Sequence, residues 1–430
     1  MRLFTGACLV AALAVTGCAS TAERKSGGAA TSAPQSGELV VGFDYPDDLD
    51  KVAEQAGLQG SKSGDLAAVA DAIVASINAD GGVGGRKIRL VKAGSDSPKT
   101  PADNAAAEQS ACQAFTQDAT VEIALSMADE RGDGFFRCLR KVGAPVLTDV
   151  GMTDPMLAAN PNVFLPHSIS LTRLAPAEVA RLKQRGFLTP SSKVGIVAAD
   201  LEPWKTVART TMAETLKQAG IQVAAVEILA NEPQKAIAGG PAIVQRFKTA
   251  GVDRVITVAP SGLTAGVTIL VGAKQRYAPR VAMTSLDFPY QLLQNLPPVA
   301  LQGVVGVGWQ PGAGDVNPGP DNPAAPSEKR CLSLLKAAGL GSTDVNTRYN
   351  QLVVCDLLLF LDAVGDRTRG QVDQARFATA AKELGTGFQS ALVFATDFRQ
   401  RRDGVSAARD LSFNAARNAF VYDGPEEPLG

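Results

Sequence analysis

The sequence predicts an α/β fold of two lobes, each built on a doubly wound parallel sheet, and two observations support this prediction. Short apolar segments typical of buried strands alternate with longer segments of helical periodicity from Glu38 onward. Apolar strands separated by helices indicate parallel sheets that are covered on both faces. The 430 residues contain more of these units than one compact sheet would hold, so we expect two lobes.

The alternation is clear in the first part of the chain. The helix expected at 65–80 carries apolar residues at helical spacing, with Asp65 placed as its N-cap and Gly81 able to end it in the left-handed conformation. In order, the expected elements are a strand at 38–43, that helix, a strand at 86–91, a helix at 101–117, a strand at 121–126, a helix at 134–143, and strands at 144–149 and 162–168.

The same cycle repeats after residue 170. In order, we expect helices at 172–186, 204–220, 241–251 and 263–277, separated by strands at 193–200, 221–229, 254–260 and 280–285. A Pro/Gly-rich loop at 311–327 precedes helices at 328–338, 347–365 and 372–384 and late strands at 391–398 and 418–424. Asp356 and Asp362 interrupt the apolar run within 347–365, so we expect a core helix there and not a membrane span.

The N-terminal segment is typical of a secretory signal. Residues 1–17 combine Arg2 with an uncharged apolar stretch that is too short for a spanning helix. The stretch ends in "VTGC", which resembles a bacterial lipobox whose cysteine, here Cys18, is acylated; a plain signal peptide with an incidental cysteine is the alternative. Residues 18–37 are small, polar and Gly/Ser-rich, and we expect them to form a flexible tether with a reach of roughly 25 Å from the lipid-anchored end.

The composition argues against nucleic acid as a partner. Lys and Arg (42) nearly cancel Asp and Glu (43), so the basic surface that phosphate backbones require is not indicated. Aromatic residues make up 5% of the chain, too few to suggest a stacking platform for single strands. We expect an exported monomer held on the extracytoplasmic face of the cell membrane by its lipid.

Four cysteines remain after export: Cys112, Cys138, Cys331 and Cys355. An even number in an oxidising compartment indicates disulfides, and the absence of a Cys-x-x-Cys pair makes a zinc site unexpected. Of the three possible pairings we predict the one with short loops, Cys112–Cys138 and Cys331–Cys355. Each bond would contribute on the order of 3 kcal/mol to stability.

The sequence contains no motif that indicates an enzyme. It has neither a G-x-S-x-G elbow nor a phosphate-binding loop, and the glycines at 81–85 follow a helix, the wrong order for a dinucleotide turn. The single histidine, His167, has no local catalytic or metal-binding signature. A secreted hydrolase would need His167, an acid and a nucleophile to converge, so we expect no enzyme and no cofactor or metal.

Two segments carry a resemblance to a known family. "INADGGVGGRKIRLV" at 77–91 is similar to the Gly-rich helix-to-strand junction of the type I periplasmic binding proteins, the branch typified by leucine/isoleucine/valine-binding proteins of ABC importers. "PVLTDVGMTDPML" at 145–157 resembles the family's strand followed by a small-small-Thr turn. The order of the α/β units agrees with the family from about 38 to 430.

The resemblance implies two lobes joined by three strand crossings, with a ligand held between them. Lobe 1 would comprise 38–166 and 312–385, and lobe 2 would comprise 167–311 and 386–430. The implied function is capture of a small polar ligand, such as an amino acid, amide or organic acid, and its delivery to an ABC permease that recognises the closed form. The alternative is an envelope sensor or adaptor lipoprotein that uses the same fold to bind another protein.

The resemblance also implies ligand contacts on lobe 1. The small-small-Thr turn maps to Gly151, Met152 and Thr153, although Thr153 could instead cap the turn before Pro155. The loop after the third strand carries hydroxyl groups in amino-acid binders. Here it offers Ser126 and Asp129, which could equally be ordinary loop polarity.

Four further candidates lie at the lobe crossing and on lobe 2. Trp204 occupies the position of an aromatic wall, or it could be the first core anchor of its helix. Asp287 ends the last strand of lobe 2, where amino-acid binders use an acid to pair the ammonium group; it could instead cap the following turn. His167 and Ser168 lie at the first crossing between lobes, where His167 could donate to the ligand or be a hinge residue that is satisfied internally.

Overall fold

A computed structural model of the chain describes residues 37–55, 62–97, 101–128, 131–311 and 324–429. The predicted signal peptide, nearly all of the tether and the acylation site Cys18 lie outside the described residues, as does Asp129. Within the described residues, no helix is both long enough and apolar enough to cross a membrane.

The first sheet is five-stranded and fully parallel, in the order β2-β1-β3-β4-β5. Its strands are β1 (Leu39–Pro46), β2 (Ile88–Ser95), β3 (Ile123–Ser126), β4 (Val146–Thr148) and β5 (Val163–Phe164). Helix α1 (Leu49–Gln55) follows β1, and the helices that cover the sheet are α2 (Leu66–Ala79), α3 (Pro101–Gln113), α4 (Asp133–Lys141), α5 (Asp154–Ala159), α12 (Pro326–Ala337), α13 (Val345–Arg367) and α14 (Gln374–Leu384). We call this sheet with its helices lobe 1.

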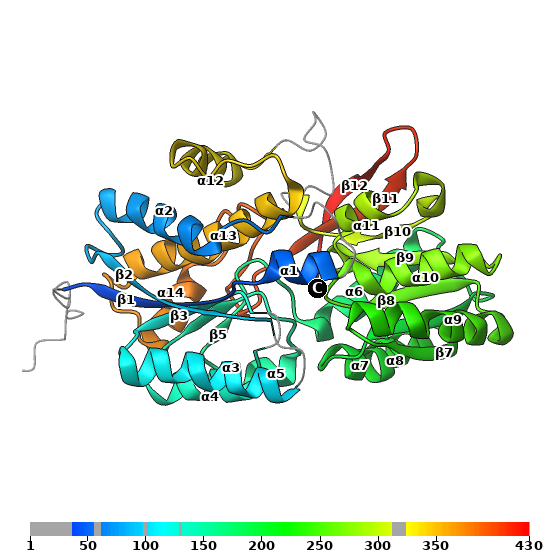
Figure 1. Ribbon diagram of the computed structural model, residues 1–430, viewed down its shortest axis with the longest axis horizontal. Coiled ribbons are helices and arrows are strands. Elements are labelled where there is room, and N and C mark those ends of the chain that lie inside the picture. Colours follow the sequence, from blue (N-terminus) through cyan, green and yellow to red (C-terminus); the bar gives the residue numbers. More distant parts are fainter. Residues whose placement is uncertain (1–36, 56–61, 98–100, 129–130, 312–323, 430) are drawn as a thin grey trace, which may run out of the picture. The chain divides into compact units, whose positions relative to one another are not determined.

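Alternate residues of the first sheet pack into two different cores, because successive side chains of a strand point to opposite faces. Val41 and Phe43 join the core that contains α2 and α13. Ala124 and Val146 join the core beneath α3 and α4. Figure 1 shows α2, α13 and α14 on one side of the sheet and α3, α4 and α5 on the other. The prediction of a parallel sheet covered on both faces is therefore confirmed for lobe 1.

The second sheet is seven-stranded, in the order β12-β11-β10-β9-β8-β6-β7. Its strands are β6 (Lys193–Ala199), β7 (Gln222–Leu229), β8 (Arg254–Val258), β9 (Arg280–Thr284), β10 (Val305–Gly308), β11 (Ala407–Asn414) and β12 (Ala419–Pro428). Its helices are α6 (Leu171–Gln184), α7 (Trp204–Val207), α8 (Ala213–Gln218), α9 (Pro233–Ala250), α10 (Gly262–Lys274) and α11 (Pro289–Asn295). We call this sheet with its helices lobe 2.

Lobe 2 departs from the predicted purely parallel pattern at one edge. β11 pairs antiparallel with β10 and with β12, so a C-terminal hairpin extends an otherwise parallel sheet. Strands β10 and β11 were not predicted, and the strand predicted at 391–398 is wrong, because most of that segment is bend and irregular backbone. Leu392 and Val393 are buried between the lobes instead. These residues are apolar because they are buried in a connecting segment. Hydrophobic periodicity alone does not distinguish such a segment from a buried strand.

Three connections join the lobes and are hydrogen-bonded to one another. The segment after β5 pairs with the segment before β11: Leu165 forms a parallel bridge with Asp403, and the Val405 amide donates to the Ser168 carbonyl. The Phe394 amide donates to the carbonyl of Trp309, which follows β10. Arg173 of α6 forms an ion pair with Asp403. The two-lobe α/β fold is confirmed, and the predicted residue boundaries, all within these connections, stay a prediction.

The Gly-rich junction at 77–91 has the geometry that its glycines predict. Gly81, Gly82, Gly84 and Gly85 all have φ between +56° and +120°, a region that other residues rarely adopt. Val83 and Arg86 exchange two backbone hydrogen bonds of 2.9 and 3.0 Å around the central glycine pair, which makes a tight reversal from α2 to β2.

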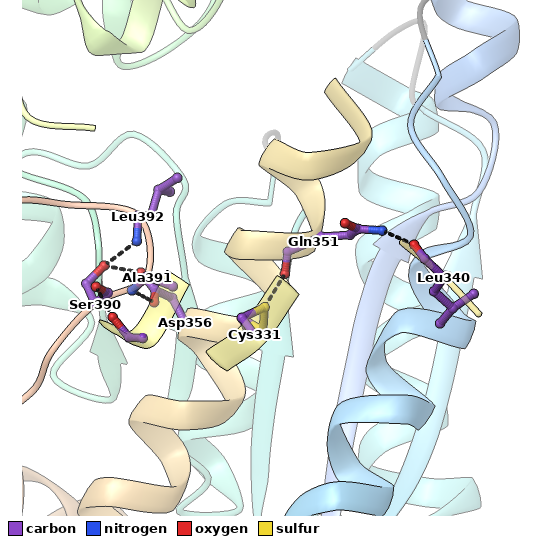
Figure 2. Close-up of a disulfide and its surroundings, with 9 residues drawn as sticks. Cys331, Leu340, Gln351, Asp356, Ser390, Ala391 and Leu392 are labelled. Carbon is purple, nitrogen blue, oxygen red and sulfur yellow. Dashed lines mark hydrogen bonds between the residues drawn. A yellow bond between two sulfur atoms is a disulfide. The ribbon is translucent and has the colours of Figure 1, made fainter. Parts of the chain in front are cut away.

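The cysteines pair as predicted. Cys112–Cys138 joins α3 to α4, with Cα atoms 6.0 Å apart. Cys331–Cys355 joins α12 to α13, with Cα atoms 6.3 Å apart, and Figure 2 shows Cys331 in contact with the Gln351 carbonyl one turn from Cys355. Both bonds tie together neighbouring helices of lobe 1.

Candidate functional site

A cavity of about 570 Å³ lies between lobe 1 and lobe 2. Its lobe 1 wall comes from the loops that follow β1, β2, β3 and β4 and from the first turns of α13. Its lobe 2 wall comes from α9, α10, α11 and the loops before them. The carboxyl ends of parallel strands meet at one edge of a sheet, and ligand sites of α/β proteins form there. We call this cavity the cleft.

The lobe 1 wall is mostly polar. Ser95, Asp96 and Ser97 at the end of β2 and Asp149 after β4 line the same wall, because both strands end at one edge of the same sheet, with β1 and β3 between them. Helix α13 adds polar groups from its first turns: Asn346, Tyr349 and Asn350. This wall can exchange hydrogen bonds with a bound molecule.

The basic residue of that wall, Arg131, is fully engaged inside lobe 1. Its Nε and one terminal nitrogen lie 2.9 Å from the two oxygens of Asp44 at the end of β1. Its guanidinium also donates to Ser95 Oγ at 3.0 Å, and Ser126 Oγ donates to Asp44 at 2.7 Å. Arg131 and Asp44 expose 1% and 0% of their side chains. A bidentate pair of this kind holds the loop ends of β1, β2 and β3 together.

The lobe 2 wall is mostly apolar. The residues that form it share aliphatic side chains on three neighbouring helices: Ile237, Leu263, Val267, Leu270, Leu292 and Leu296. Ile237 and Leu270 are 58% and 37% exposed, although most large aliphatic residues of the described chain are buried. Exposed aliphatic side chains gathered along one wall of a cavity are typical of a binding surface.

Three aromatic residues that line the cleft meet across the two lobes. Phe288 and Tyr290 of lobe 2 meet Tyr349 of α13, with ring centroids 5.0 Å apart for Phe288 and Tyr349 and 6.1 Å apart for the two tyrosines. Phe288 has φ +46°, in the left-handed region that strains a non-glycine residue. The Asn346 amide donates to Gln294 Oε1 at 3.4 Å, which adds a polar link between the lobes.

The predicted lobe 1 contacts that the structure describes are not among the residues that line the cleft. Ser126 is fully buried and bound to Asp44, and the Met152 side chain is fully buried in the core beneath α3 and α4. Thr153 Oγ1 accepts from the Met156 amide at 3.4 Å and so caps α5, the alternative role raised from its sequence. Gly151 lies against the indole of Trp204, where an added Cβ would come within 2.5 Å of the ring.

Trp204 and Asp287 lie inside lobe 2. Trp204 is 5% exposed and packs between its own lobe and Gly151 of lobe 1. Asp287 forms a capping box, in which its Oδ2 accepts from the Thr284 amide at 2.8 Å. Burial raises the pKa of Asp287 to about 7. Burial, with a smaller contribution from Asp287, also raises the pKa of Glu178 on α6 well above its usual value.

His167 lies at the first crossing, between two carboxylates. Its Nε2 is 3.9 Å from Asp149 Oδ2 and its Nδ1 is 3.6 Å from Asp356 Oδ2, both beyond hydrogen-bond length. Asp356 accepts from the Ser390 hydroxyl and from the Ala391 amide (Figure 2). Because the serine is bound to the carboxylate and not to the imidazole, this group lacks the nucleophile–base contact of a hydrolase.

Of the eight predicted contact residues that the structure describes, none is among the residues that line the cleft. Ligand contact by these residues and by Asp129 stays a prediction. The sequence reasoning missed Asp149, Ser95 and Asp96. Asp149 is the last residue of the strand predicted at 144–149, and Ser95 and Asp96 come a few residues after the strand predicted at 86–91. Polar residues at or shortly after the ends of strands were the signal that could have found them.

Sequence and structure comparisons relate this chain to known proteins. A sequence model of a family described as "Periplasmic binding protein" matches residues 52–417. Among proteins with curated descriptions, none matches the sequence.

Solved structures similar to this chain include an ABC transporter solute-binding protein from R. palustris in complex with 4-hydroxybenzoate (17% identity, 90% of this chain and 96% of that chain, TM-score 0.65). A branched chain amino acid ABC transporter protein from Thermus thermophilus with bound valine is also similar (14% identity, 91% and 97%, TM-score 0.67). At these identities the likeness shows the fold.

Proposed function

The chain belongs to the periplasmic binding protein family, and from this premise we propose that it captures a small molecule in the cleft and delivers it to an ABC importer. The observation that carries the proposal is the cleft itself: an open cavity of about 570 Å³ at the carboxyl ends of the lobe 1 strands, with one polar and one apolar wall. Pockets of about 300–1,000 Å³ are the usual size for small-molecule sites.

Capture in this geometry works through the relative position of the lobes. A ligand that touches both walls has a higher affinity for the closed arrangement, so binding shifts the population toward it. The three hydrogen-bonded connections form the hinge about which the lobes move. A permease that recognises the closed form then distinguishes the loaded protein from the empty one. Small-angle scattering should show a smaller radius of gyration once ligand is added.

An adaptor that binds another protein would be favoured by a collapsed or an apolar cleft. The cleft is open, and its lobe 1 wall carries Asp96, Arg131 and Asp149. We therefore retain small-molecule capture as the function.

We further propose that the protein is anchored by a lipid on Cys18, outside the cytoplasm, where its family works. The lipobox-like "VTGC" and the Gly/Ser-rich tether support this. Mass spectrometry of the N-terminal peptide should find an acylated Cys18, and the Cys18→Ser variant should leave the membrane fraction. An unmodified N-terminal cysteine would contradict the anchor and leave the capture proposal standing.

The test of capture is thermal unfolding of the purified protein against a broad metabolite panel. A ligand at 100 times its Kd adds about 2.7 kcal/mol to the free energy of unfolding and so raises Tm. The Ser261→Trp variant, which fills the cleft at the start of α10, should lose the shift. The matched control Gln218→Trp, exposed at the end of α8, should keep it. A panel without a single hit would refute the proposal.

A further inference from the structure

We infer that the ligand is a cationic amphiphile: a molecule with an ammonium or guanidinium head held at Asp149 and an apolar body that lies on the lobe 2 wall. The inference rests on the proposed function, since it names the chemical class of the molecule that the cleft captures. Three features of the cleft support it: the apolar lobe 2 wall, the pairing of Arg131 with Asp44, and the buried oxygen of Asp149 that receives no hydrogen bond from any described residue.

The apolar wall favours a ligand with an apolar body. Ile237 and Leu270 expose 58% and 37% of their surface although they line a cavity, and Leu263, Val267 and Leu292 continue the wall. Removing such surface from water contributes roughly 25 cal/mol per Å² of apolar area. A small polar zwitterion would leave most of this apolar wall exposed to water, whereas an alkyl or aryl body would cover it.

Among the described residues that line the cleft, none offers a free cation to a carboxylate head. Arg131 is the one basic residue among the described residues that line the cleft. Its side chain is 1% exposed, and the nitrogens that reach Asp44 and Ser95 are already donating. Asp44 also cancels its charge. An anionic head would therefore enter a wall that offers it hydrogen bonds but no counter-charge, at a substantial desolvation cost.

The other charged residues among those described in the cleft wall are acidic. Asp96 and Asp149 both line the cleft, and the carboxylates of Asp47 and Asp48 lie within 4.8 Å of that of Asp96. Asp149 is the more enclosed of the two wall residues, with 15% of its side chain exposed. Its Oδ1 is buried and receives no hydrogen bond from any described residue. A carboxylate held in this state is stabilised by a cation brought against it.

The groups around Asp149 do not already supply that cation. The nearest base is His167, whose Nε2 lies 3.9 Å from Asp149 Oδ2. The other nitrogen of the same imidazole lies 3.6 Å from Asp356, which is fully buried. One imidazole thus lies between two acidic side chains and is within hydrogen-bond length of neither. A cationic ligand head at the cleft face of Asp149 would give this side chain a direct partner.

The test uses probes that share one apolar body and differ in the head. Calorimetric titration at pH 7 compares 4-butylbenzylamine, 4-butylbenzyl alcohol and 4-butylbenzoate, with leucine as the small zwitterion. We expect the amine to bind most tightly. Shortening its alkyl chain should weaken binding by about fourfold per CH₂, the factor that corresponds to burial of one methylene.

Two sets of variants separate the head contact from the body contact. Asp149→Asn should raise the Kd of the amine by about 10- to 100-fold, the factor expected for loss of a hydrogen bond to a charged group. The Kd of the alcohol should change by less than about threefold. Ile237→Ser with Leu270→Ser should flatten the chain-length dependence for all heads. Val299→Ser, at a residue that is 70% exposed and not among those lining the cleft, is the matched control and should leave it unchanged.

The outcomes distinguish this inference from the proposed function. Tighter binding of the benzoate or of leucine than of the amine overturns the inference and leaves capture intact. Equal effects of Asp149→Asn on amine and alcohol also overturn it. Failure of all four probes, with a hit elsewhere in the metabolite panel, overturns the inference alone, whereas failure of the probes and of the whole panel overturns both.

Discussion

Replacing Asp287 by Asn should change how stability depends on pH. Asp287 is fully buried, and burial raises its pKa from 3.8 to about 7. A carboxyl whose pKa is raised in the folded state contributes its full stability below the unfolded pKa and loses it as pH rises through the folded pKa. The wild-type protein should therefore lose stability between about pH 4 and pH 7, and the Asn variant should not lose this part.

The magnitude follows from the difference between the two pKa values. About three pKa units correspond to roughly 4 kcal/mol between low pH and neutral pH. Between pH 5 and pH 7 the share is about 2 kcal/mol, because the unfolded carboxyl is already largely ionised at pH 5. Asn keeps an oxygen that can accept from the Thr284 amide, so the capping box survives the substitution.

Urea unfolding at pH 5, 6, 7 and 8, with the disulfides intact, measures the effect. The free energy of unfolding of Asp287→Asn minus that of wild type should rise by about 2 kcal/mol from pH 5 to pH 7 and level off above pH 8. The control Asp118→Asn, at an exposed position, should give a flat difference. Parallel pH curves for wild type and Asp287→Asn would refute the reasoning, because they would mean that Asp287 titrates alike in both states.

Three further predictions concern stability. Replacing Cys331 and Cys355 by Ser should lower the free energy of unfolding by about 3 kcal/mol, from the loop that the bond closes, and an unchanged denaturation midpoint would contradict this. Gly82→Ala should destabilise by about 1–3 kcal/mol and by more than Gly85→Ala, because both have positive φ but only Gly82 has backbone in the way of a Cβ; equal thermal shifts would count against that account. Arg131→Met should destabilise by about 3–5 kcal/mol, because it leaves Asp44 buried without its partner, and a loss below about 1 kcal/mol in chemical denaturation would show that the pair is dispensable.

The order of helices and strands was largely predictable because it depends on local patterns. The helix at 65–80 has apolar residues at helical spacing, an N-cap and a glycine stop, and the structure forms α2 with Asp65 accepting from the Ala68 amide. The failures came where burial has a non-local cause. Residues 391–398 are apolar because they pass between the lobes, and β11 alternates polar and apolar residues because it forms one half of an edge hairpin.

The candidate site was less predictable, because side-chain direction depends on partners that are remote in sequence. Ser126 is the last residue of a strand, as expected of a cleft residue, yet its hydroxyl donates inward to Asp44, which is 82 positions away. Trp204 is buried because Gly151 of the other lobe leaves room for its ring. Asp149 lines the same cleft wall as Ser95 and Asp96 because β2 and β4 end at one edge of the same sheet, with β1 and β3 between them.

By itself, the sequence determined the alternation of elements, the glycine-dependent reversal at 77–91 and the pairing of the cysteines. These features rest on backbone conformation, hydrophobic periodicity and short loop closure, all of which act between near neighbours in the chain. Only the tertiary structure decided which polar groups face the cleft and which form hydrogen bonds or ion pairs inside a lobe. That outcome depends on the pairing of buried charges and on packing across the two sheets, where residues far apart in sequence compete for the same partners.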